Sequence, residues 1–244
     1  MRRFYAPPEQ FSDGNVELGL EETRHLRDVL RLREGAEINI FDGDGREFLC
    51  SVGKIEKKST KAAIKAEIDP VSPESHLELD LAVGLLKGEK FDLIVQKAVE
   101  LGVSRIQPLY TKRSDVKFGI KDARTERWRK IALEAAKQCG RAKLTEIANP
   151  IEFEDFIETF DTSPAADEGR IFFTEHDGKS FEVGKQFKKI TALIGPEGGW
   201  ETSELDSALK GGFELITLGG RILRAETAVI SVAAILQHRF GDLI

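Results

Sequence analysis

Two glycine-bearing segments in the second half of the chain carry residues suited to ligand binding. The segment ALIGPEGGW, residues 192–200, leads from an apolar stretch into three glycines, one proline and the carboxylate of Glu197. The segment LGGRILRAET, residues 218–227, places two glycines ahead of two arginines and Glu226. Glycine allows a backbone to approach a ligand closely, and proline fixes φ and removes a donor. Each segment is suited to a binding loop, although a tight turn between a strand and a helix explains either one alone.

The two segments lack the patterns that cradle phosphates. A P-loop requires G-x-x-x-x-G-K-[ST], and a dinucleotide fold requires G-x-G-x-x-G at its first turn. The carboxylate of Glu197 would repel a phosphate, whereas a neutral or cationic ligand would tolerate it. S-adenosylmethionine, which carries a sulfonium charge, meets that condition. A nucleotide-dependent enzyme is therefore the weaker hypothesis.

The elements around these loops indicate a mainly parallel sheet. Strands are predicted at 76–86, 105–111, 170–176, 190–195 and 213–219, and helices at 89–102, 124–140, 202–212 and 225–240. This alternation is typical of an α/β fold with helices on both faces of the sheet. Ligands of such sheets bind beyond the carboxyl ends of the strands. Both glycine-bearing loops follow strands, so we expect them at that edge.

The first part of the chain shows another pattern. A helix is predicted in EETRHLRDVLRLREG, and three alternating runs across residues 36–69 predict an antiparallel meander. The DGDG at 42–45 favours a hairpin because glycine adopts positive φ easily. The prolines and serines of DPVSPES, residues 69–75, indicate a domain boundary. We expect a small β-barrel or sandwich over residues 1–72 and an α/β domain over 73–244.

Arginines on the predicted first helix suggest a nucleic-acid surface. A helical spacing places Arg24, Arg27 and Arg31 on one face. The opposite, apolar face is predicted to hold Leu26, Val29 and Leu30. The net charge of −6 argues against a protein that coats nucleic acid through bulk positive charge, but it allows a local basic face. A solvated face balanced by nearby carboxylates is the alternative.

Composition argues against several other classes. Cys50 and Cys139 lie far apart, and the four histidines are scattered, so we expect neither a disulfide framework nor a bound metal. No segment approaches the roughly twenty apolar residues of a membrane span. The opening residues MRRFYAPPEQ have no apolar run behind their arginines. We therefore expect a cytoplasmic protein with no membrane partner.

Four motifs in order resemble the ribosomal RNA small subunit methyltransferase E family of the SPOUT, or trefoil-knotted, methyltransferases. They are KGEKFDLIVQKAVELGVSRIQPLYTKRS, RWRKIALEAAKQCGR, LIGPEGGW and LGGRILRAETAVISVAAIL. The segments MRRFYAP and HLRDVLRLREG also resemble that family's PUA-like domain. The resemblance implies an RNA-binding PUA-like β-barrel domain and a SPOUT domain that ends in a knot. It further implies S-adenosylmethionine as cofactor and methylation of N3 of a uridine in the decoding region of 16S ribosomal RNA, within the small ribosomal subunit.

The resemblance also assigns a cofactor pocket and an oligomer. The pocket residues that it implies are Leu193, Gly195, Pro196, Glu197, Gly198, Gly199, Leu218, Gly219, Ile222 and Leu223. SPOUT enzymes generally form dimers through the knot region. A homodimer here would bury part of the last helix between subunits, with Val229, Val232, Ala233 and Leu236 at the interface.

Methyl transfer to a uracil N3 needs in-line alignment and loss of the N3 proton. Cations near a carbonyl oxygen of the base would favour its anion, and Arg221 and Arg224 are candidates. The carboxylate candidates near N3 are Glu197, Glu226 and Glu100. The preferred pair is Arg224 with Glu226. For Glu100, a surface ion pair with Lys97 is an equal alternative.

Contacts to RNA are expected at eight residues: Arg2, Arg3, Arg24, Arg27, Arg31, Arg113, Arg141 and Trp200. Trp200 is the candidate for base stacking, whereas Trp128 is expected in the core. Two other functions remain open. A SpoU-like relative would methylate the ribose 2′-oxygen with the same cofactor, and a protein with a decayed pocket would bind RNA or assist ribosome assembly without catalysis.

Overall fold

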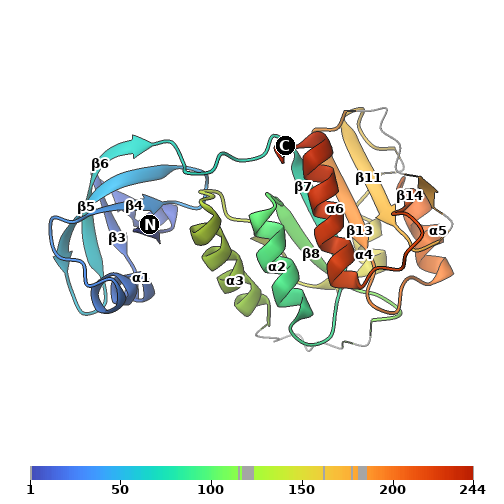
Figure 1. Ribbon diagram of the computed structural model, residues 1–244, viewed down its shortest axis with the longest axis horizontal. Coiled ribbons are helices and arrows are strands. Elements are labelled where there is room, and N and C mark those ends of the chain that lie inside the picture. The colour runs from blue at the N-terminus through green and yellow to red at the C-terminus, as the bar shows by residue number, and fades with distance from the viewer. Residues whose placement is uncertain are drawn as a thin grey trace. The chain divides into compact units, whose positions relative to one another are not determined.

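The computed structural model describes residues 2–114, 116, 124–161, 163–176, 178–180 and 186–243. It divides into two compact units, which Figure 1 shows with their element labels. The first unit comprises Met1–Glu74 and Ala136–Leu144, and the second comprises Ser75–Ala135 and Thr145–Ile244. The first unit thus includes a segment that lies well beyond the predicted boundary at residue 72.

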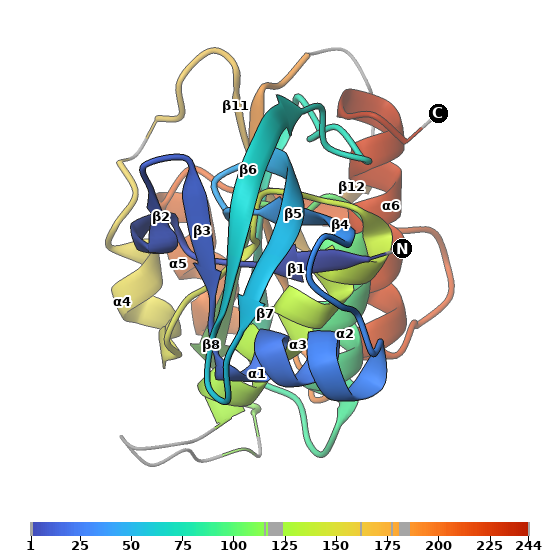
Figure 2. The ribbon, with the colours of Figure 1, turned by 90° about the vertical axis from the view of Figure 1, so that its left-hand side faces the viewer.

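The first unit is built on a six-stranded sheet in the order β1-β4-β5-β6-β3-β2. Its strands are β1 (Arg3–Tyr5), β2 (Phe11–Ser12), β3 (Asn15–Leu18), β4 (Glu37–Phe41), β5 (Glu47–Ile55) and β6 (Thr60–Ile68). Its helical elements are η1 (Pro8–Gln10), α1 (Leu20–Arg24) and η2 (His25–Val29). The predicted meander is confirmed as the antiparallel strands β4, β5 and β6, and the sheet curls around its core (Figure 2). Among the described strand pairs of this sheet, β1 and β4 alone are parallel.

The first helix is shorter than predicted. It passes into the π-helical turn η2, and Arg31 then takes a left-handed φ of 52°. The N–H of Leu32 donates to the carbonyl of Leu26, and both leucine side chains are buried. Val29 is 68% exposed and Leu30 is 37% exposed, so the predicted apolar face is wrong at both positions. The wider π-helical turn brings Leu32 back to the core. Because Arg31 has left the helical conformation, it does not continue the helix face on which Arg24 lies.

Two arginines expected to contact RNA are instead buried. Arg3 is paired with Glu47 at 3.0 Å, and it donates to the carbonyls of Ala136 at 2.9 Å and Arg141 at 2.8 Å. Arg141 is paired with Glu74 at 2.7 Å. Their guanidinium groups are committed to carboxylates and carbonyls inside the first unit, so neither is available to a phosphate. The prediction of RNA contact by Arg3 and Arg141 is wrong for this reason.

The second unit contains an eight-stranded sheet in which every described strand pair is parallel. Its strands are β7 (Glu78–Gly84), β8 (Arg105–Tyr110), β9 (Glu146–Ile147), β10 (Ile151–Glu152), β11 (Glu168–Phe173), β12 (Lys179–Ser180), β13 (Lys189–Ile194) and β14 (Glu214–Thr217). The order is β10-β8-β7-β13-β11-β14-β12, with β9 beside β8. Its helices are α2 (Lys90–Glu100), α3 (Arg124–Cys139), α4 (Phe153–Ile157), α5 (Thr202–Lys210) and α6 (Ala225–Phe240). The predicted alternation of strands and helices is confirmed.

Helices cover both faces of this sheet. Figure 2 shows α4 and α5 on one side and α2, α3 and α6 on the other. The α4 and α5 side packs aromatic residues such as Phe153, Phe172 and Phe213 into one core. Trp128 of α3 is 2% exposed and its ring lies 4.3 Å from that of Phe91, which confirms its predicted core position. No helix among the described residues is long and apolar enough to span a membrane.

The last helix does not expose the residues predicted to form a subunit interface. The apolar side chains in question are all buried within this chain: Val229, Val232, Ala233 and Leu236. They form the side of α6 that packs on β7 and β13, because a helix on a parallel sheet needs an apolar stripe facing the strands. The predicted interface residues are therefore core residues, which is a correction to that part of the dimer prediction.

Candidate active site

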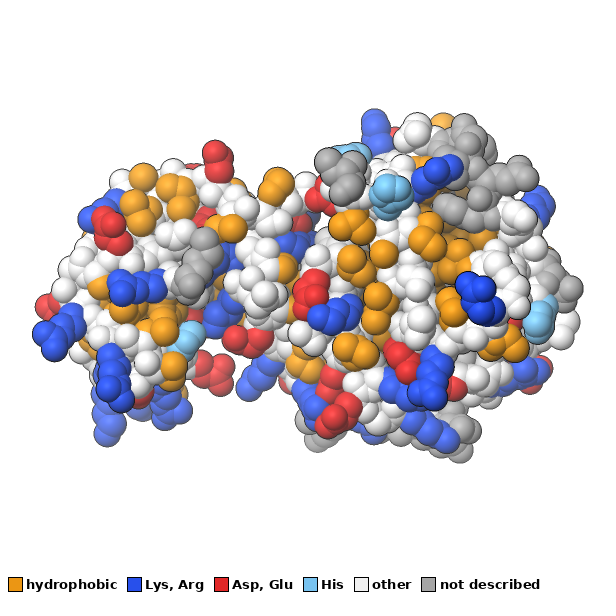
Figure 3. Space-filling view, viewed as in Figure 1, with side chains coloured by type: hydrophobic (Ala, Val, Ile, Leu, Met, Phe, Trp, Pro, Cys, Tyr) orange, Lys and Arg blue, Asp and Glu red, His pale blue; other side chains and the backbone are white. Residues whose placement is uncertain are grey.

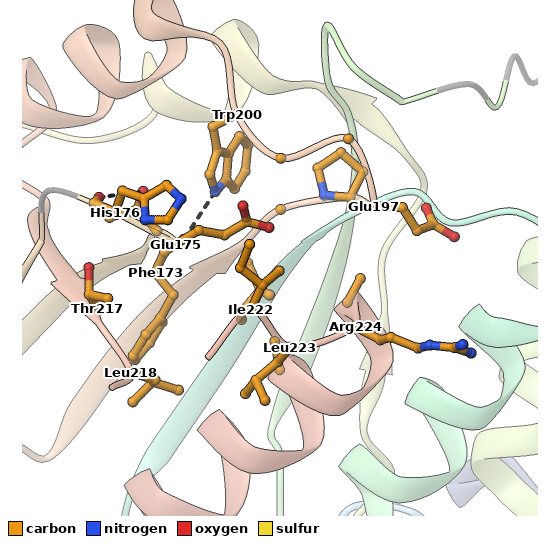
Figure 4. Close-up of a pocket in the computed structure, with 18 of the residues that line it drawn as sticks. Phe173, Glu175, His176, Glu197, Trp200, Thr217, Leu218, Ile222, Leu223 and Arg224 are labelled. Carbon is orange, nitrogen blue, oxygen red and sulfur yellow. Dashed lines mark hydrogen bonds between the residues drawn. The ribbon is translucent and has the colours of Figure 1, made fainter. Parts of the chain in front are cut away.

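A cavity of about 620 Å³ lies at the carboxyl ends of three neighbouring strands, β13, β11 and β14. Its walls are the loop after β13, the loop between β14 and α6, and the end of β11 (Figure 4). Because β11 lies between β13 and β14, its last residues fill the space beneath both loops. The two glycine-bearing segments lie side by side at the edge where α/β sheets bind ligands.

The loop after β13 needs glycine for packing at its first position. A Cβ on Gly195 would lie 2.9 Å from Nε1 of Trp200, closer than real Cβ contacts come. That indole N–H donates to the carbonyl of Phe173 at 3.0 Å and so ties the loop to the end of β11. The N–H of Gly199, which has a φ of 67°, donates to the carbonyl of Pro196 and closes the turn. The fold of the loop, rather than ligand contact alone, dictates these glycines.

Trp200 is part of the core beneath the cavity. Its ring lies 4.5 Å from that of Phe172 and 5.4 Å from that of Phe153, measured between centroids. Because its N–H is hydrogen-bonded and its ring packs against two other rings, the indole supports the loop from the core side. The prediction that Trp200 stacks on an RNA base is not supported by this position.

Two surface cations hold the same loop in place. Arg113 pairs with Glu201 at 2.8 Å and donates to the carbonyl of Gly198 at 3.2 Å. Glu201 in turn caps α5 in a reciprocal capping box with Glu204. These contacts fix the backbone between Gly198 and α5, so Arg113 acts first on the shape of the cavity. Its predicted contact with RNA stays a prediction.

The second cation is Lys90, at the start of α2. Its Nζ donates to Oε1 of Glu197 at 2.8 Å, and the two side chains are each about a third exposed. Partial burial raises the pKa of Glu197, but the bond from Lys90 and backbone N–H groups outweigh burial and lower that pKa overall. The same hydrogen bond raises the pKa of Lys90. The loop carboxylate is therefore ionised and paired at neutral pH.

Charged groups also gather where the second loop meets α6. Arg221 and Arg224 line the cavity, and Arg224 is the residue immediately before the helix. Glu226 lies in the first turn, where the helix dipole favours a carboxylate. Its Oε2 is buried without a hydrogen-bond partner in the described part of the chain. Arg224 and Glu226 both act electrostatically on Lys90, so the three groups are neighbours.

The structure brings most of the predicted pocket residues together. Those that line the cavity are Gly195, Pro196, Glu197, Gly198, Gly199, Leu218, Gly219, Ile222 and Leu223. Leu193 is different, because its side chain is fully buried in the core under α4 and α5 and does not reach the cavity. Alternate residues of a strand point to opposite faces, and a residue inside β13 must pack against a helix. Leu193 is therefore corrected to a core residue.

The predicted catalytic residues divide into two groups. Glu197, Arg221 and Arg224 line the cavity, and Glu226 is adjacent to it. Glu100 lies at the opposite end of α2 from Lys90, roughly 15 Å along the helix axis at 1.5 Å per residue. It pairs with Lys97 at 2.8 Å, as the surface alternative predicted. Glu100 is therefore removed from the candidate site of this chain.

The third wall of the cavity, which the end of β11 supplies, was not predicted from the sequence. Phe173, Thr174, Glu175 and His176 follow one another along this wall. The sequence identified the strand, but strand order decides which strand ends meet, and no local pattern encodes that order. Its only signal was the run TEH directly after an apolar strand.

An all-parallel α/β unit with a cavity at its strand ends, joined to a small β unit, defines a class of ligand-binding enzyme folds. Residues 73–237 match the RNA methyltransferase domain family, and residues 19–65 match the RNA methyltransferase PUA domain family. A ribosomal RNA small subunit methyltransferase E of a Synechocystis strain is 32% identical over 93% of this chain and 74% of its own length. One from Bacillus subtilis is 31% identical over 90% of this chain and 88% of its own.

Solved structures agree with these matches. The ribosomal RNA small subunit methyltransferase E of Neisseria gonorrhoeae, bound to S-adenosyl methionine, superposes with a TM-score of 0.87 at 31% identity and full coverage of both chains. A Legionella pneumophila protein in complex with the cofactor SAM gives a TM-score of 0.88 at 32% identity and 99% coverage of both chains. The chain belongs to the ribosomal RNA small subunit methyltransferase E family of RNA methyltransferases.

Proposed function

We propose that the protein transfers a methyl group from S-adenosylmethionine to N3 of a uridine in the decoding region of 16S ribosomal RNA. The observation that carries the proposal is the cavity between the two glycine-bearing loops, whose volume of about 620 Å³ falls in the range of small-molecule sites. Family membership and the cofactor in the Neisseria structure support the same reaction.

The residues of the cavity fit this cofactor. Leu218, Ile222 and Leu223 offer apolar surface to a flat adenine, and backbone groups of both loops are available to its edge. A Cβ added to Gly199 or Gly219 would contact no atom within 4 Å, so the loops leave open space at both positions. When bound, S-adenosylmethionine supplies a methyl group on a sulfonium.

The chain's own contribution is alignment and control of the uracil proton. We assign to Arg224, which lines the cavity, the stabilisation of negative charge on a uracil carbonyl oxygen. We assign the acceptance of the N3 proton to Glu226, and its buried Oε2, which has no hydrogen-bond partner among the described residues, supports this role. Lys90 neutralises Glu197, which keeps that carboxylate from competing for the same cations.

The proposal extends to topology and assembly. We propose that these loops belong to a trefoil knot, as the family resemblance implies, and that the protein acts in the cytoplasm as a homodimer on the small ribosomal subunit. Exposed apolar residues on the α2 and α6 side, Leu93 and Ile235, support an interface there. The exposed arginines Arg2, Arg24, Arg31 and Arg113 and the half-buried Arg27 are proposed to contact RNA.

The test is methyl transfer from labelled S-adenosylmethionine to small-subunit particles and to naked 16S RNA, followed by mass analysis of nucleosides. We expect N3-methyluridine, with a loss of at least about 100-fold in kcat for Arg224→Ala and Glu226→Ala. A ribose-methylated nucleoside would favour the SpoU-like alternative. Absence of both cofactor binding and transfer would favour a non-catalytic protein, and full activity of both variants would show that this pair is not catalytic.

A further inference from the structure

Glu175 is an exposed residue whose side chain lines the cavity. It follows β11 by two residues, and the hydroxyl of the preceding Thr174 donates to the carbonyl of His176 at 3.0 Å, which shapes the backbone on either side of it. Figure 4 shows its side chain extending from the end of the strand into the space beside Ile222. Within the described residues, this carboxylate forms no hydrogen bond or ion pair. It is the charged part of the wall that sequence analysis missed.

Three of the other charged side chains that line the cavity, Lys90, Glu197 and Arg113, are already paired. Of the two carboxylates that line the described part of the cavity, Glu197 is held by Lys90 at 2.8 Å. Arg113 is close enough to Glu175 to interact with it electrostatically, but its ion pair is with Glu201 at 2.8 Å. The cavity therefore holds one carboxylate without a described cationic partner, and Arg221 and Arg224 also line it. This arrangement suits a ligand that brings a cation to the β11 wall.

We propose that Glu175 binds the α-ammonium group of the methionine part of S-adenosylmethionine, an inference that rests on the proposed function. An ammonium donates up to three hydrogen bonds and accepts none, so a free carboxylate is its natural partner. The cofactor's own carboxylate would then turn away from Glu175, and Arg221 and Arg224 are the cavity-lining cations available to it. Glu175 thus orients the amino-acid tail and leaves the transferring methyl group untouched.

The ammonium is a better partner than the sulfonium on energetic grounds. The sulfonium loses its positive charge as the methyl group leaves. A carboxylate beside it would therefore stabilise the ground state more than the transition state and slow the reaction. The ammonium keeps its charge throughout, so binding it stabilises both states equally. Loss of Glu175 should then raise KM for the cofactor and leave kcat nearly unchanged.

Calorimetric titration of Glu175→Gln against wild type tests the assignment with three ligands. S-adenosylmethionine carries both cations, S-adenosylhomocysteine keeps only the ammonium, and 5′-methylthioadenosine has neither. We expect affinity for the first two to fall about tenfold each, the size of a charged hydrogen bond, and affinity for the third to stay within about twofold. Retained binding of the third ligand also shows that the variant is folded. Glu214→Gln, on the exposed side of β14 and outside the cavity lining, is the matched control and should bind all three like wild type.

The remaining outcomes separate this inference from the proposed function. Weaker binding of S-adenosylmethionine alone would place Glu175 at the sulfonium, and weaker binding of all three would place it at the ribose or adenine; either result overturns the assignment. Unchanged binding of all three by Glu175→Gln would also overturn it while leaving the proposed function intact. If wild type binds none of the ligands, the proposed function itself fails.

Discussion

At the scale of single residues, the cavity loop is tightly packed at Gly195. Gly195→Ala would push a methyl group against the indole of Trp200 and weaken its bond to the carbonyl of Phe173. We expect a loss of about 1–3 kcal/mol in unfolding free energy, the usual cost of overpacking, and weaker cofactor binding. Chemical denaturation and calorimetry measure the two effects. Gly220→Ala is the control, because a Cβ there meets nothing within 4 Å; equal behaviour of the two variants would show that Trp200 does not constrain the loop.

The Lys90–Glu197 pair gives a prediction about pH at the same scale. Glu197 has a pKa below its ordinary 4.5. Its contribution to folding stability is therefore fully present above pH 4.5 and is lost as the pH falls through the lowered pKa. Lys90 has a pKa above its ordinary 10.5. Its contribution to folding stability is therefore lost only as the pH rises through the raised pKa. The difference in Tm between wild type and Glu197→Gln should therefore be constant from about pH 6 to about pH 9 and shrink in acid. A difference that changes across neutral pH would contradict the pairing.

At the scale of elements, the first unit depends on Arg3. Its guanidinium joins β1 to Glu47 of β5 and to two carbonyls of Ala136–Leu144, and both side chains of the ion pair are buried. Removing one partner of a buried pair leaves an uncompensated charge, so Arg3→Ala should lower the unfolding free energy by about 3–5 kcal/mol. Arg2→Ala, at an exposed neighbour, should change it by less than about 0.5 kcal/mol. Equal stability of the two variants in denaturant would refute a structural role for Arg3.

The elements themselves were largely predictable, and their assembly was not. Apolar runs such as ITALIG and the helix closed by Gly102 carry local signals, and β13 and α2 lie where those signals indicate. The π-helical turn before Arg31 was missed because Val29 occupies a position that an amphipathic α-helix would bury, and the sequence does not show that Val29 is exposed. Arg3 and Arg141 were mistaken for surface cations because their carboxylate partners, Glu47 and Glu74, are far away in sequence. Such long-range pairs leave no local pattern.

The candidate site shows the same limit. The two glycine-bearing loops could be assigned because glycine, proline and charged residues follow apolar strands within a few positions. Glu175 could not, because its role depends on β11 lying between β13 and β14. Leu193 was wrongly assigned to the cavity because the sequence does not show which helices cover each face of the sheet. In the structure its side chain is on the face covered by α4 and α5.

At the scale of the whole molecule, the proposed homodimer predicts an apolar contact on the α2 and α6 side of the second unit. Figure 3 shows hydrophobic side chains gathered over the region of α6, where Ile235 is 37% exposed, and Leu93 of α2 is 41% exposed. Ile235→Glu should convert the dimer to a folded monomer, because an interface cannot bury an unpaired charge. Sedimentation measures the change, with Leu209→Glu on α5 as the control. A dimer that survives Ile235→Glu, or a monomeric wild type, would contradict this interface.

The central claim is that the loops after β13 and β14 form one cofactor site. A crystal structure of the protein with S-adenosylmethionine tests it most directly. The account predicts the adenosyl group between Gly195–Trp200 and Thr217–Leu223, with the methionine tail towards the end of β11. Cofactor bound anywhere else on the chain, or an empty cavity at saturating cofactor, would contradict the account.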